Sequence, residues 1–243
     1  MKSIQLNTDV KCNKPYKFNN LEFNKVSLAL FDLDNTLIAG DSDHAWGEFL
    51  VNKKLVDAAE YKKANDHYYT AYQQGTLDIH DYLAFSLRPL TQYSTQEMLS
   101  WREIFIEECI RPILLTAATE LLDKHRQQGH EILIITATNR FITEPIAKLL
   151  GVQELIAVEP EFINGSYTGK ILGTPSFREG KVTRLNEWLA SKDLSLKNSW
   201  FYSDSHNDLP LLELVDNPVA VDPDELLQER AIKEGWSIIS LRG

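Results

Sequence analysis

The sequence of 243 residues predicts an α/β protein with a doubly wound parallel sheet and an inserted α-helical cap. Three observations predict this fold. The nearly continuous apolar run at 26–31 is typical of a strand that is buried on both faces of a parallel sheet. A helical pattern then extends over 40–111, which is too long for a single crossover connection. From residue 112 onward, helices and strands alternate, as they do in doubly wound proteins.

These patterns divide the chain into three predicted parts. We expect an N-terminal extension over 1–24, because this stretch is polar, rich in Asn and Lys, and lacks the apolar segment of a secretion signal. The sheet domain takes 25–39 and 112–243. The cap lies between them at 40–111, where apolar and aromatic residues recur at helical spacing and are expected to form its core.

Start and stop signals place the elements of the second half. The predicted helices are 114–128, 143–150, 181–190 and 209–215. The predicted strands are 130–135, 155–158, 200–202 and 219–221. The Asn164-Gly165 pair predicts a type I′ turn in a hairpin over 162–172. A last helix and strand are expected before residue 241.

Composition and charge exclude several classes of partner. The formal net charge of −10 disfavours nucleic acid or an anionic membrane surface. No apolar run reaches the roughly 18 residues of a membrane span. Cys12 and Cys109 lack metal-ligand spacing, so we expect two reduced thiols in a cytoplasmic protein.

Two carboxylates directly follow the first predicted strand. Asp32 and Asp34 lie where ligands bind in open α/β sheets, beyond the carboxyl end of a strand. Two neighbouring anions repel each other, which favours a divalent cation beside them. A pair that only caps a loop is the alternative. A calcium loop is rejected, because Leu37 and Asp43 replace the Gly and Glu that its sixth and twelfth positions require.

Polar residues also follow later predicted strands. Thr136 follows the second strand, Asp204 and Asp208 follow the fourth, and Lys181 begins the helix before the fourth. Each of these residues, taken alone, is as typical of a helix cap or a solvated side chain as of a binding site. Together they should meet at one edge of the sheet, because parallel strands point their carboxyl ends the same way. A hard cation with a lysine and a hydroxyl beside it suits a phosphate.

These segments resemble a known family. In order, they match the four motifs of the haloacid dehalogenase-like phosphohydrolases: Asp-Leu-Asp-Asn-Thr at 32–36, Thr136, Lys181, and Ser-Asp-Ser-His-Asn-Asp at 203–208. The resemblance covers 26–241. The position of the helical insertion and the separation of Lys181 from Asp204 are similar to those of the subfamily that contains phosphoserine phosphatases.

The resemblance implies a Mg²⁺-dependent phosphomonoesterase. Asp32 would attack phosphorus and form an aspartyl-phosphate. Mg²⁺ would bind the carboxylates of Asp32 and Asp204 and the backbone carbonyl of Asp34. Asp208 would orient a metal-bound water or hold Lys181. Asp34 would also act as the general acid and then the general base.

The resemblance also implies groups that bind the phosphoryl oxygens and the substrate. Thr136, Lys181 and the backbone N–H of Ala137 would stabilise the transferring phosphoryl group. Cap residues should select the leaving group. In phosphoserine phosphatases an acidic residue binds the substrate ammonium and a cap Arg binds its carboxylate. The residues expected to contact substrate here are Asp41, Arg88 and Asn207.

Several functions remain open at this point. The predicted substrate is a small phosphorylated metabolite, phosphoserine or a similar amino-alcohol phosphate. Related capped phosphatases act on histidinol phosphate or on choline and ethanolamine phosphates, and these are alternatives. A non-catalytic phosphoacceptor or binding module that needs Mg²⁺ is an alternative of a different class. A P-loop is rejected, because 165–170 has the wrong spacing and Ile171 replaces the required Ser or Thr.

Overall fold

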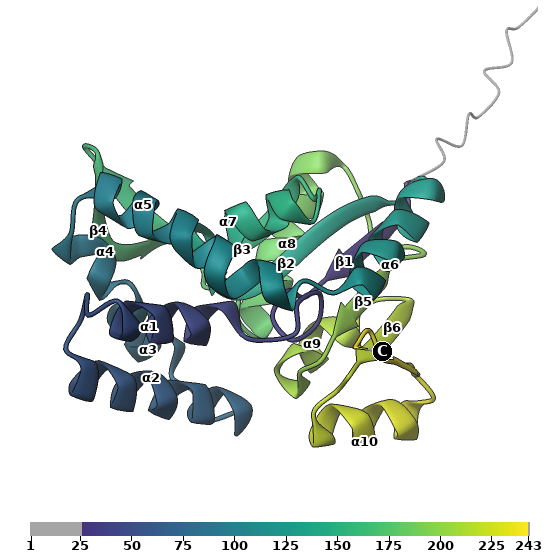
Figure 1. Cartoon of the computed structure of the whole chain (residues 1–243). Helices are drawn as coiled ribbons and strands as arrows, with labels where there is room; N and C mark the ends of the chain where they lie inside the picture. The colour runs from purple at the N-terminus through teal and green to yellow at the C-terminus, as the bar shows by residue number, and fades with distance from the viewer. Residues whose placement is uncertain (1–25, 243) are drawn as a thin grey trace, which may run out of the picture.

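A single mixed sheet forms the centre of the protein in the computed structural model, which describes residues 26–242 (Figure 1). Within these residues seven strands pair in the order β4-β3-β2-β1-β5-β6-β7. Their bounds are Leu28–Phe31 for β1, Glu131–Asn139 for β2, Glu154–Ile163 for β3, Ser166–Leu172 for β4, Trp200–Ser203 for β5, Asn217–Val221 for β6 and Ser237–Ile239 for β7. The predicted extension at 1–24 and Cys12 lie outside the described residues.

The order of the strands creates one place where the chain reverses its direction of travel across the sheet. From β1 the chain moves outward through β2 and β3, and it then returns to add β5, β6 and β7 on the other side of β1. All neighbours are parallel except β3 and β4. The loops after β1 and β5 therefore border the switch point, where open α/β sheets bind ligands. The predicted doubly wound fold is confirmed.

The first strand is apolar throughout because both of its faces are covered. Ala29 and Phe31 belong to one hydrophobic core, and Leu28 and Leu30 belong to a second core on the other face. All four side chains are fully buried. The first core also holds residues of α6 and α7, and the second holds residues of α8, α9 and α10. Burial on both faces explains why this strand shows no alternation of apolar and polar residues.

Helices fill the insertion between β1 and β2, as predicted. They are α1 (Ser42–Asn52), α2 (Ala58–Gln73), α3 (Ile79–Ser86), α4 (Arg88–Gln92), α5 (Thr95–Phe105), a π-helical turn (Ile106–Ile110) and a 3₁₀ turn (Arg111–Ile113). Side chains of Asp41, Asp57, Asp78 and Ser94 accept backbone N–H groups at the starts of α1, α2, α3 and α5. These N-caps fix where the chain turns into each helix.

One aromatic cluster joins the insertion to the sheet domain. Trp46 of α1 packs against Phe105 of α5 with ring centroids 5.1 Å apart, and against Phe141 of α7 at 5.9 Å. The insertion thus extends the hydrophobic core on the α7 face of the sheet instead of forming a separate one. The start of α1 is anchored close to the loop that follows β1.

The remaining helices alternate with the strands. They are α6 (Thr116–Gln127), α7 (Arg140–Leu149), α8 (Glu179–Lys192), α9 (Leu209–Leu212) and α10 (Glu225–Glu234), with a 3₁₀ turn at His206–Asp208. Asn164 and Gly165 both have positive φ, at 51° and 85°, which confirms the type I′ turn between β3 and β4. None of the helices in residues 26–242 combines the length and the apolar composition needed to cross a bilayer.

The second strand is longer than the sequence suggested. We expected a strand over 130–135 followed by a loop, but β2 continues to Asn139 through a shift in its pairing with β3. The side chain of Asn139 then caps α7, which begins at Arg140 and not at the predicted Thr143. Thr136 therefore lies within a strand, where residues two apart share a face.

Candidate active site

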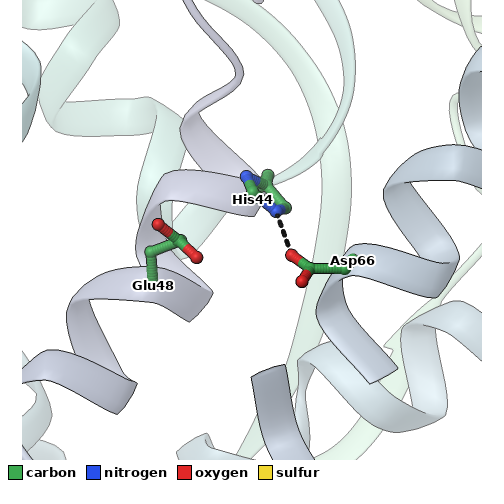
Figure 2. Close-up of side chains that lie close together, drawn as sticks. All are labelled: His44, Glu48 and Asp66. Atoms are coloured by element: carbon green, nitrogen blue, oxygen red, sulfur yellow. Dashed lines mark hydrogen bonds and ion pairs between the residues drawn. The ribbon is translucent and has the colours of Figure 1, made fainter. Parts of the chain in front are cut away.

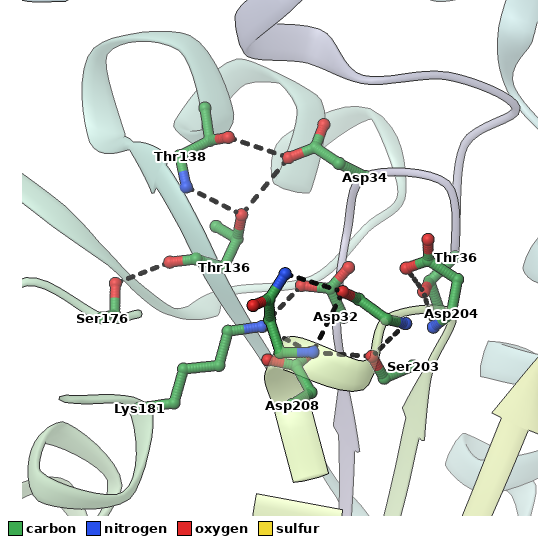
Figure 3. A network of polar contacts seen from close by, with 12 residues as sticks. Asp32, Asp34, Thr36, Thr136, Thr138, Ser176, Lys181, Ser203, Asp204 and Asp208 are labelled. Atoms are coloured by element: carbon green, nitrogen blue, oxygen red, sulfur yellow. Dashed lines mark hydrogen bonds and ion pairs between the residues drawn. The ribbon is translucent and has the colours of Figure 1, made fainter. Parts of the chain in front are cut away.

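Lys181 joins two of the predicted aspartates at the switch point. Its Nζ lies 2.7 Å from Oδ1 of Asp32 and 2.7 Å from Oδ2 of Asp208 (Figure 3). The Ser203 hydroxyl donates a third hydrogen bond, 2.7 Å long, to Oδ2 of Asp208. All four side chains are buried. Strands β1 and β5 and helix α8 are thereby tied together through one ammonium group.

The first turn of α8 positions Lys181 and needs a glycine at residue 180. A Cβ atom on Gly180 would lie 2.0 Å from the carbonyl oxygen of Pro175. The backbone N–H of Gly180 donates to Phe177, and that of Lys181 donates to Arg178. This tight turn lets the long lysine side chain reach across to the ends of β1 and β5.

Asp34 faces a second group of donors. Its Oδ1 accepts the backbone N–H of Ser42 at 2.7 Å, and its Oδ2 accepts the hydroxyls of Thr138 at 2.9 Å and Thr136 at 3.4 Å. The Ser176 hydroxyl donates to the Thr136 carbonyl at 2.6 Å. The two threonines reach the same carboxylate because they are two residues apart in β2.

The loops after β1 and β5 are also linked by Thr36. Its hydroxyl donates to Oδ1 of Asp204 and accepts the backbone N–H of Asp204, both at 3.1 Å (Figure 3). One carboxylate of the first loop, Asp32, and one of the second, Asp204, thus border the same space. Thr36 belongs to the first predicted motif, but the sequence alone assigned it no role.

Burial and mutual repulsion disfavour the charged forms of these carboxylates. Burial raises the pKa of Asp32 to about 7 and that of Asp34 to about 6. Burial and the charge of Asp32 raise the pKa of Asp204 well above its ordinary value. Burial lowers the pKa of Lys181, but the charges of Asp208 and Asp32 outweigh it and raise the pKa above the usual range. Within residues 26–242, Lys181 is the only basic side chain paired with these aspartates.

The donor set at this point suits a magnesium ion. Asp32 and Asp204 offer carboxylate oxygens, and the excess of negative charge over the single Lys181 ammonium is the condition that a divalent cation relieves. Mg²⁺ prefers oxygen ligands and is commonly held by one or two carboxylates with water and phosphate. The residues labelled in Figure 3 include neither His nor Cys, the side chains whose nitrogen or sulfur atoms would favour a softer metal.

A cavity opens from these carboxylates toward the inserted helices. Its walls come from the loop after β1, from α1 and α2, from the start of α3, and from the end of β2. The lining residues are Asp32, Asp34, Asp41, Asp43, His44, Asn65, Tyr68, Tyr69, Tyr72, Leu77, Ile79, Tyr82, Thr136, Ala137 and Thr138. The cavity is therefore acidic at its base and aromatic along the walls that the insertion supplies.

Two of the four residues predicted to contact the substrate line the cavity, and two do not. Asp41 and Ala137 line the cavity. Arg88 does not: its side chain is exposed and its guanidinium lies 5.8 Å from the ring centroid of Phe85. Asn207 is buried outside the cavity lining.

Asn207 instead takes part in a link between the insertion and the sheet domain. Its Nδ2 donates to the carbonyl of Tyr72 at 3.0 Å, and its Oδ1 accepts Nε of Arg178 at 3.0 Å. Arg178 also donates from Nη2 to the carbonyl of Gly75. Arg178 and Asn207 thus hold the end of α2 against the edge of the active site.

Two histidines near the site, His44 and His206, form local hydrogen bonds. Nδ1 of His206 lies 2.7 Å from Asp224. Nε2 of His44 lies 3.1 Å from Oδ1 of Asp66, and Glu48 is close by (Figure 2). Nζ of Lys62 pairs with Glu48 at 2.6 Å and with Asp66 at 3.3 Å, so this surface cluster already holds a cation.

Comparison with known proteins now decides the family. The family model described as haloacid dehalogenase-like hydrolase matches residues 29–213. The chain belongs to this family. The matched range runs from the strand that precedes Asp32 to beyond the loop that carries Asp204 and Asp208, so it includes all of these aspartates and Lys181. The predicted resemblance and the predicted phosphatase class are confirmed.

Relatives within the haloacid dehalogenase-like family carry two different substrate names. A histidinol-phosphatase from Neisseria meningitidis serogroup C (strain 8013) is 46% identical over 220 residues, covering 89% of this chain and 99% of that protein. Phosphoserine phosphatase SerB1 from Mycobacterium tuberculosis is 29% identical over 217 residues, covering 88% of this chain and 70% of that protein. A protein of unknown function from Bordetella pertussis Tohama I has a crystal structure with TM-score 0.84 and 45% identity, covering 89% of this chain and 99% of that one.

Sequence reasoning did not single out every residue at this site of the haloacid dehalogenase-like fold. Thr138 and the Ser42 backbone were missed, although both bind Asp34. Asp43 was considered only as a failed calcium-loop position, yet it lines the cavity. The signal that marks Asp43 is its place two residues after Asp41, at the start of a helix that faces the site.

Proposed function

We propose that this protein is a Mg²⁺-dependent phosphomonoesterase that hydrolyses histidinol phosphate. The observation that carries the choice of substrate is the charge of the cavity. Four aspartates line it, and within the described residues no Lys or Arg does. Histidinol phosphate offers this surface an ammonium and an imidazole and has no carboxylate. Phosphoserine carries a carboxylate, which would lie among aspartates with no Lys or Arg in the lining to bind it.

Two further observations favour histidinol phosphate over phosphoserine and over the phosphates of choline and ethanolamine. The relative named histidinol-phosphatase matches nearly its whole length at 46% identity. The cavity also has an aromatic wall made by Tyr68, Tyr69 and Tyr82, on which a planar imidazole can pack. Phosphoethanolamine would leave that wall without a contact, and phosphocholine has no N–H to donate to an aspartate.

The proposed reaction uses the groups around Lys181 in two steps. Asp32 attacks phosphorus and the ester oxygen leaves, which gives an aspartyl-phosphate and histidinol. Lys181, the Thr136 hydroxyl and the backbone N–H of Ala137 stabilise the charge on the phosphoryl oxygens. Asp208 holds Lys181 in place through its 2.7 Å contact. Water then hydrolyses the aspartyl-phosphate and restores Asp32.

The metal would be held by side chains on both loops. Asp32, Asp204 and the backbone carbonyl of Asp34 are the proposed ligands of Mg²⁺. When bound, Mg²⁺ neutralises phosphate and carboxylate charge, so that two anions can approach each other. Asp41 is proposed to bind the substrate ammonium.

Asp34 is proposed to donate a proton to the leaving oxygen and then to accept one from water. We expect Asp34→Asn to lower kcat/KM for an alkyl phosphate by about 10²-fold or more. Burial raises the pKa of Asp34 to about 6, so the acid is protonated below that pH and the first step slows as the pH rises through it. The variant should lose this dependence. An unchanged rate and pH profile of kcat/KM would contradict the role.

A substrate panel tests the proposed function. Phosphate release is measured from histidinol phosphate, phosphoserine, phosphoethanolamine, phosphocholine and an aryl phosphate, each with Mg²⁺ and with EDTA. We expect kcat/KM for histidinol phosphate to exceed that for phosphoserine by at least about tenfold, which corresponds to one charged contact, and EDTA to stop turnover. A preference for phosphoserine would refute the substrate. Absence of Mg²⁺-dependent turnover on all five would favour a binding module.

A further inference from the structure

One buried carboxylate of the cavity has no role in the reaction described above. Asp43 is in the first turn of α1, lines the cavity and is 7% exposed. Tyr82 of α3 lines the same cavity, and its hydroxyl is near enough to favour the charged form of the Asp43 carboxyl group. Within residues 26–242 no Lys, Arg or His forms an ion pair with Asp43. A carboxylate in such a place is costly unless a partner of opposite charge is supplied.

The remaining acids of the cavity all have strong partners. Lys181 pairs with Asp32, and the Ser42 N–H and two threonine hydroxyls bind Asp34. Asp41 accepts the backbone N–H groups of Asp43 and His44 at 2.9 and 2.8 Å. Among the described residues, Asp43 has no such partner, and the polar group near it is the neutral phenol of Tyr82. It therefore has free acceptor capacity directed into the cavity.

We propose that Asp43 and Tyr82 form the subsite that recognises the imidazole ring of the substrate. A ring N–H donates to the Asp43 carboxylate, and the ring packs against the aromatic wall. This inference rests on the proposed function, because it assigns the distal part of histidinol phosphate to a place in the cavity. It makes Asp43 a specificity-determining residue and gives it no part in phosphoryl transfer.

The order of groups in the cavity fits the order of groups in the ligand. Asp32 and Asp34 lie in the loop after β1, Asp41 is the N-cap of α1 and Asp43 is in the first turn of α1, and all four line the cavity. In histidinol phosphate the ester oxygen, the ammonium and the imidazole also follow one another along a short carbon chain. Matching these series places the imidazole at Asp43, beyond the ammonium at Asp41.

Aromatic packing holds this part of the cavity in place. The Tyr82 ring lies 5.3 Å from that of Tyr68, which lies 5.2 Å from that of Phe85. Tyr61 packs on Phe85 at 4.5 Å. The rings join α2 to α3 and hold Tyr82 in the cavity wall. A preorganised acceptor of this kind loses little entropy when it binds a planar donor.

The protonation of Asp43 agrees with a cationic or proton-sharing ligand. Burial, with the charges of Asp41 and Asp34, raises the pKa of Asp43 to about 8. A free imidazole has a pKa of about 6.5. Near neutral pH the carboxyl of Asp43 is therefore mostly protonated and the free ring is mostly neutral, and on binding the Asp43 proton moves into the hydrogen bond with a ring nitrogen.

The test compares two substrates in Asp43→Asn. The variant keeps the shape of the side chain and removes the charge, so it should weaken binding of the imidazole. We expect the kcat/KM of histidinol phosphate relative to that of phosphoethanolamine to fall about 10- to 100-fold, through KM more than kcat. Asp81→Asn, an exposed first-turn acid on α3, is the matched control and should leave the ratio unchanged. Tyr82→Phe should lower the ratio in the same direction by a smaller factor and serves if Asp43→Asn fails to fold.

The outcomes separate this inference from the proposed function. If the wild-type enzyme does not hydrolyse histidinol phosphate, the proposed function fails and the subsite fails with it. If the wild type hydrolyses histidinol phosphate but neither variant lowers the ratio, the subsite alone is refuted. Equal losses on both substrates would show that Asp43 supports the fold of the cap and does not recognise the ring.

Discussion

Asp32→Asn is expected to abolish turnover while the protein stays folded. Asparagine has the same shape but cannot serve as a nucleophile, so kcat should fall by at least about 10⁴-fold. Lys181 keeps Asp208 as its partner at 2.7 Å, which limits the structural damage. Steady-state phosphate release with histidinol phosphate or an aryl phosphate measures the loss.

A control and a second measurement make this prediction specific to Asp32. Asp66→Asn changes an exposed aspartate that pairs with Lys62 on the surface of the cap, and it should retain the wild-type rate. In wild-type enzyme stopped with acid during turnover, intact-mass measurement should detect one added phosphoryl group, which the Asp32→Asn protein should lack. Retention of activity in Asp32→Asn would refute the nucleophile, and a phosphoryl group on another residue would reassign it.

Lys181→Met is expected to damage both stability and activity. The lysine is 1% exposed and is the shared partner of Asp32 and Asp208. Removing one partner of a buried ion pair typically costs about 3–5 kcal/mol, because the other charge stays buried. The loss of a phosphoryl-stabilising cation should lower kcat on the order of 10²- to 10³-fold. Denaturant unfolding in EDTA and steady-state kinetics with Mg²⁺ measure the two effects.

The pH dependence of the Lys181→Met deficit has a definite sign. Burial already raises the pKa of Asp32 to about 7 with the lysine present, and its removal should raise that pKa further. An acid whose pKa is higher in the folded than in the unfolded state destabilises the fold as the pH rises between the two values. The difference in stability from wild type should therefore shrink toward about pH 5 and grow toward about pH 8.

Lys192→Met is the matched control for Lys181→Met. Lys192 lies on the same helix and pairs with Glu154, but its side chain is 43% exposed. Surface pairs contribute at most about 1 kcal/mol, so this variant should be close to wild type in both stability and rate. A Lys181→Met protein as stable and as active as Lys192→Met would refute the role of the buried ammonium.

The centre of the site was predictable because strand ends are readable in a sequence. An apolar run followed at once by Asp32 and Asp34 marks a buried strand and its terminus, and the same logic found Asp204. In parallel strands these ends must meet, so convergence follows from the order of elements alone. Lys181 and Asp32 are far apart in the sequence, yet Nζ of the lysine lies 2.7 Å from Oδ1 of the aspartate.

The residues that were missed depend on features that have no local signature. Thr138 reaches Asp34 only because β2 continues past 135 through a shift in register with β3, and such a shift is set by packing between strands. Arg88 was assigned to substrate by resemblance, but it is exposed. Which face of a short cap helix points into the cavity is decided by tertiary contacts, and the sequence of that helix does not specify it.

The link between α2 and the sheet domain has a consequence for how this scaffold can be altered. Arg178 and Asn207 reach the cap at the carbonyls of Gly75 and Tyr72, so the hydrogen bonds of this link use main-chain atoms of the cap, while the Tyr72 ring also packs near Phe177. Residues other than Tyr72 that face the cavity from α2 and α3 can therefore be exchanged while the link survives. Redesign of the leaving-group preference should be attempted by replacing cap side chains, with the loop residues Arg178 and Asn207 left as they are.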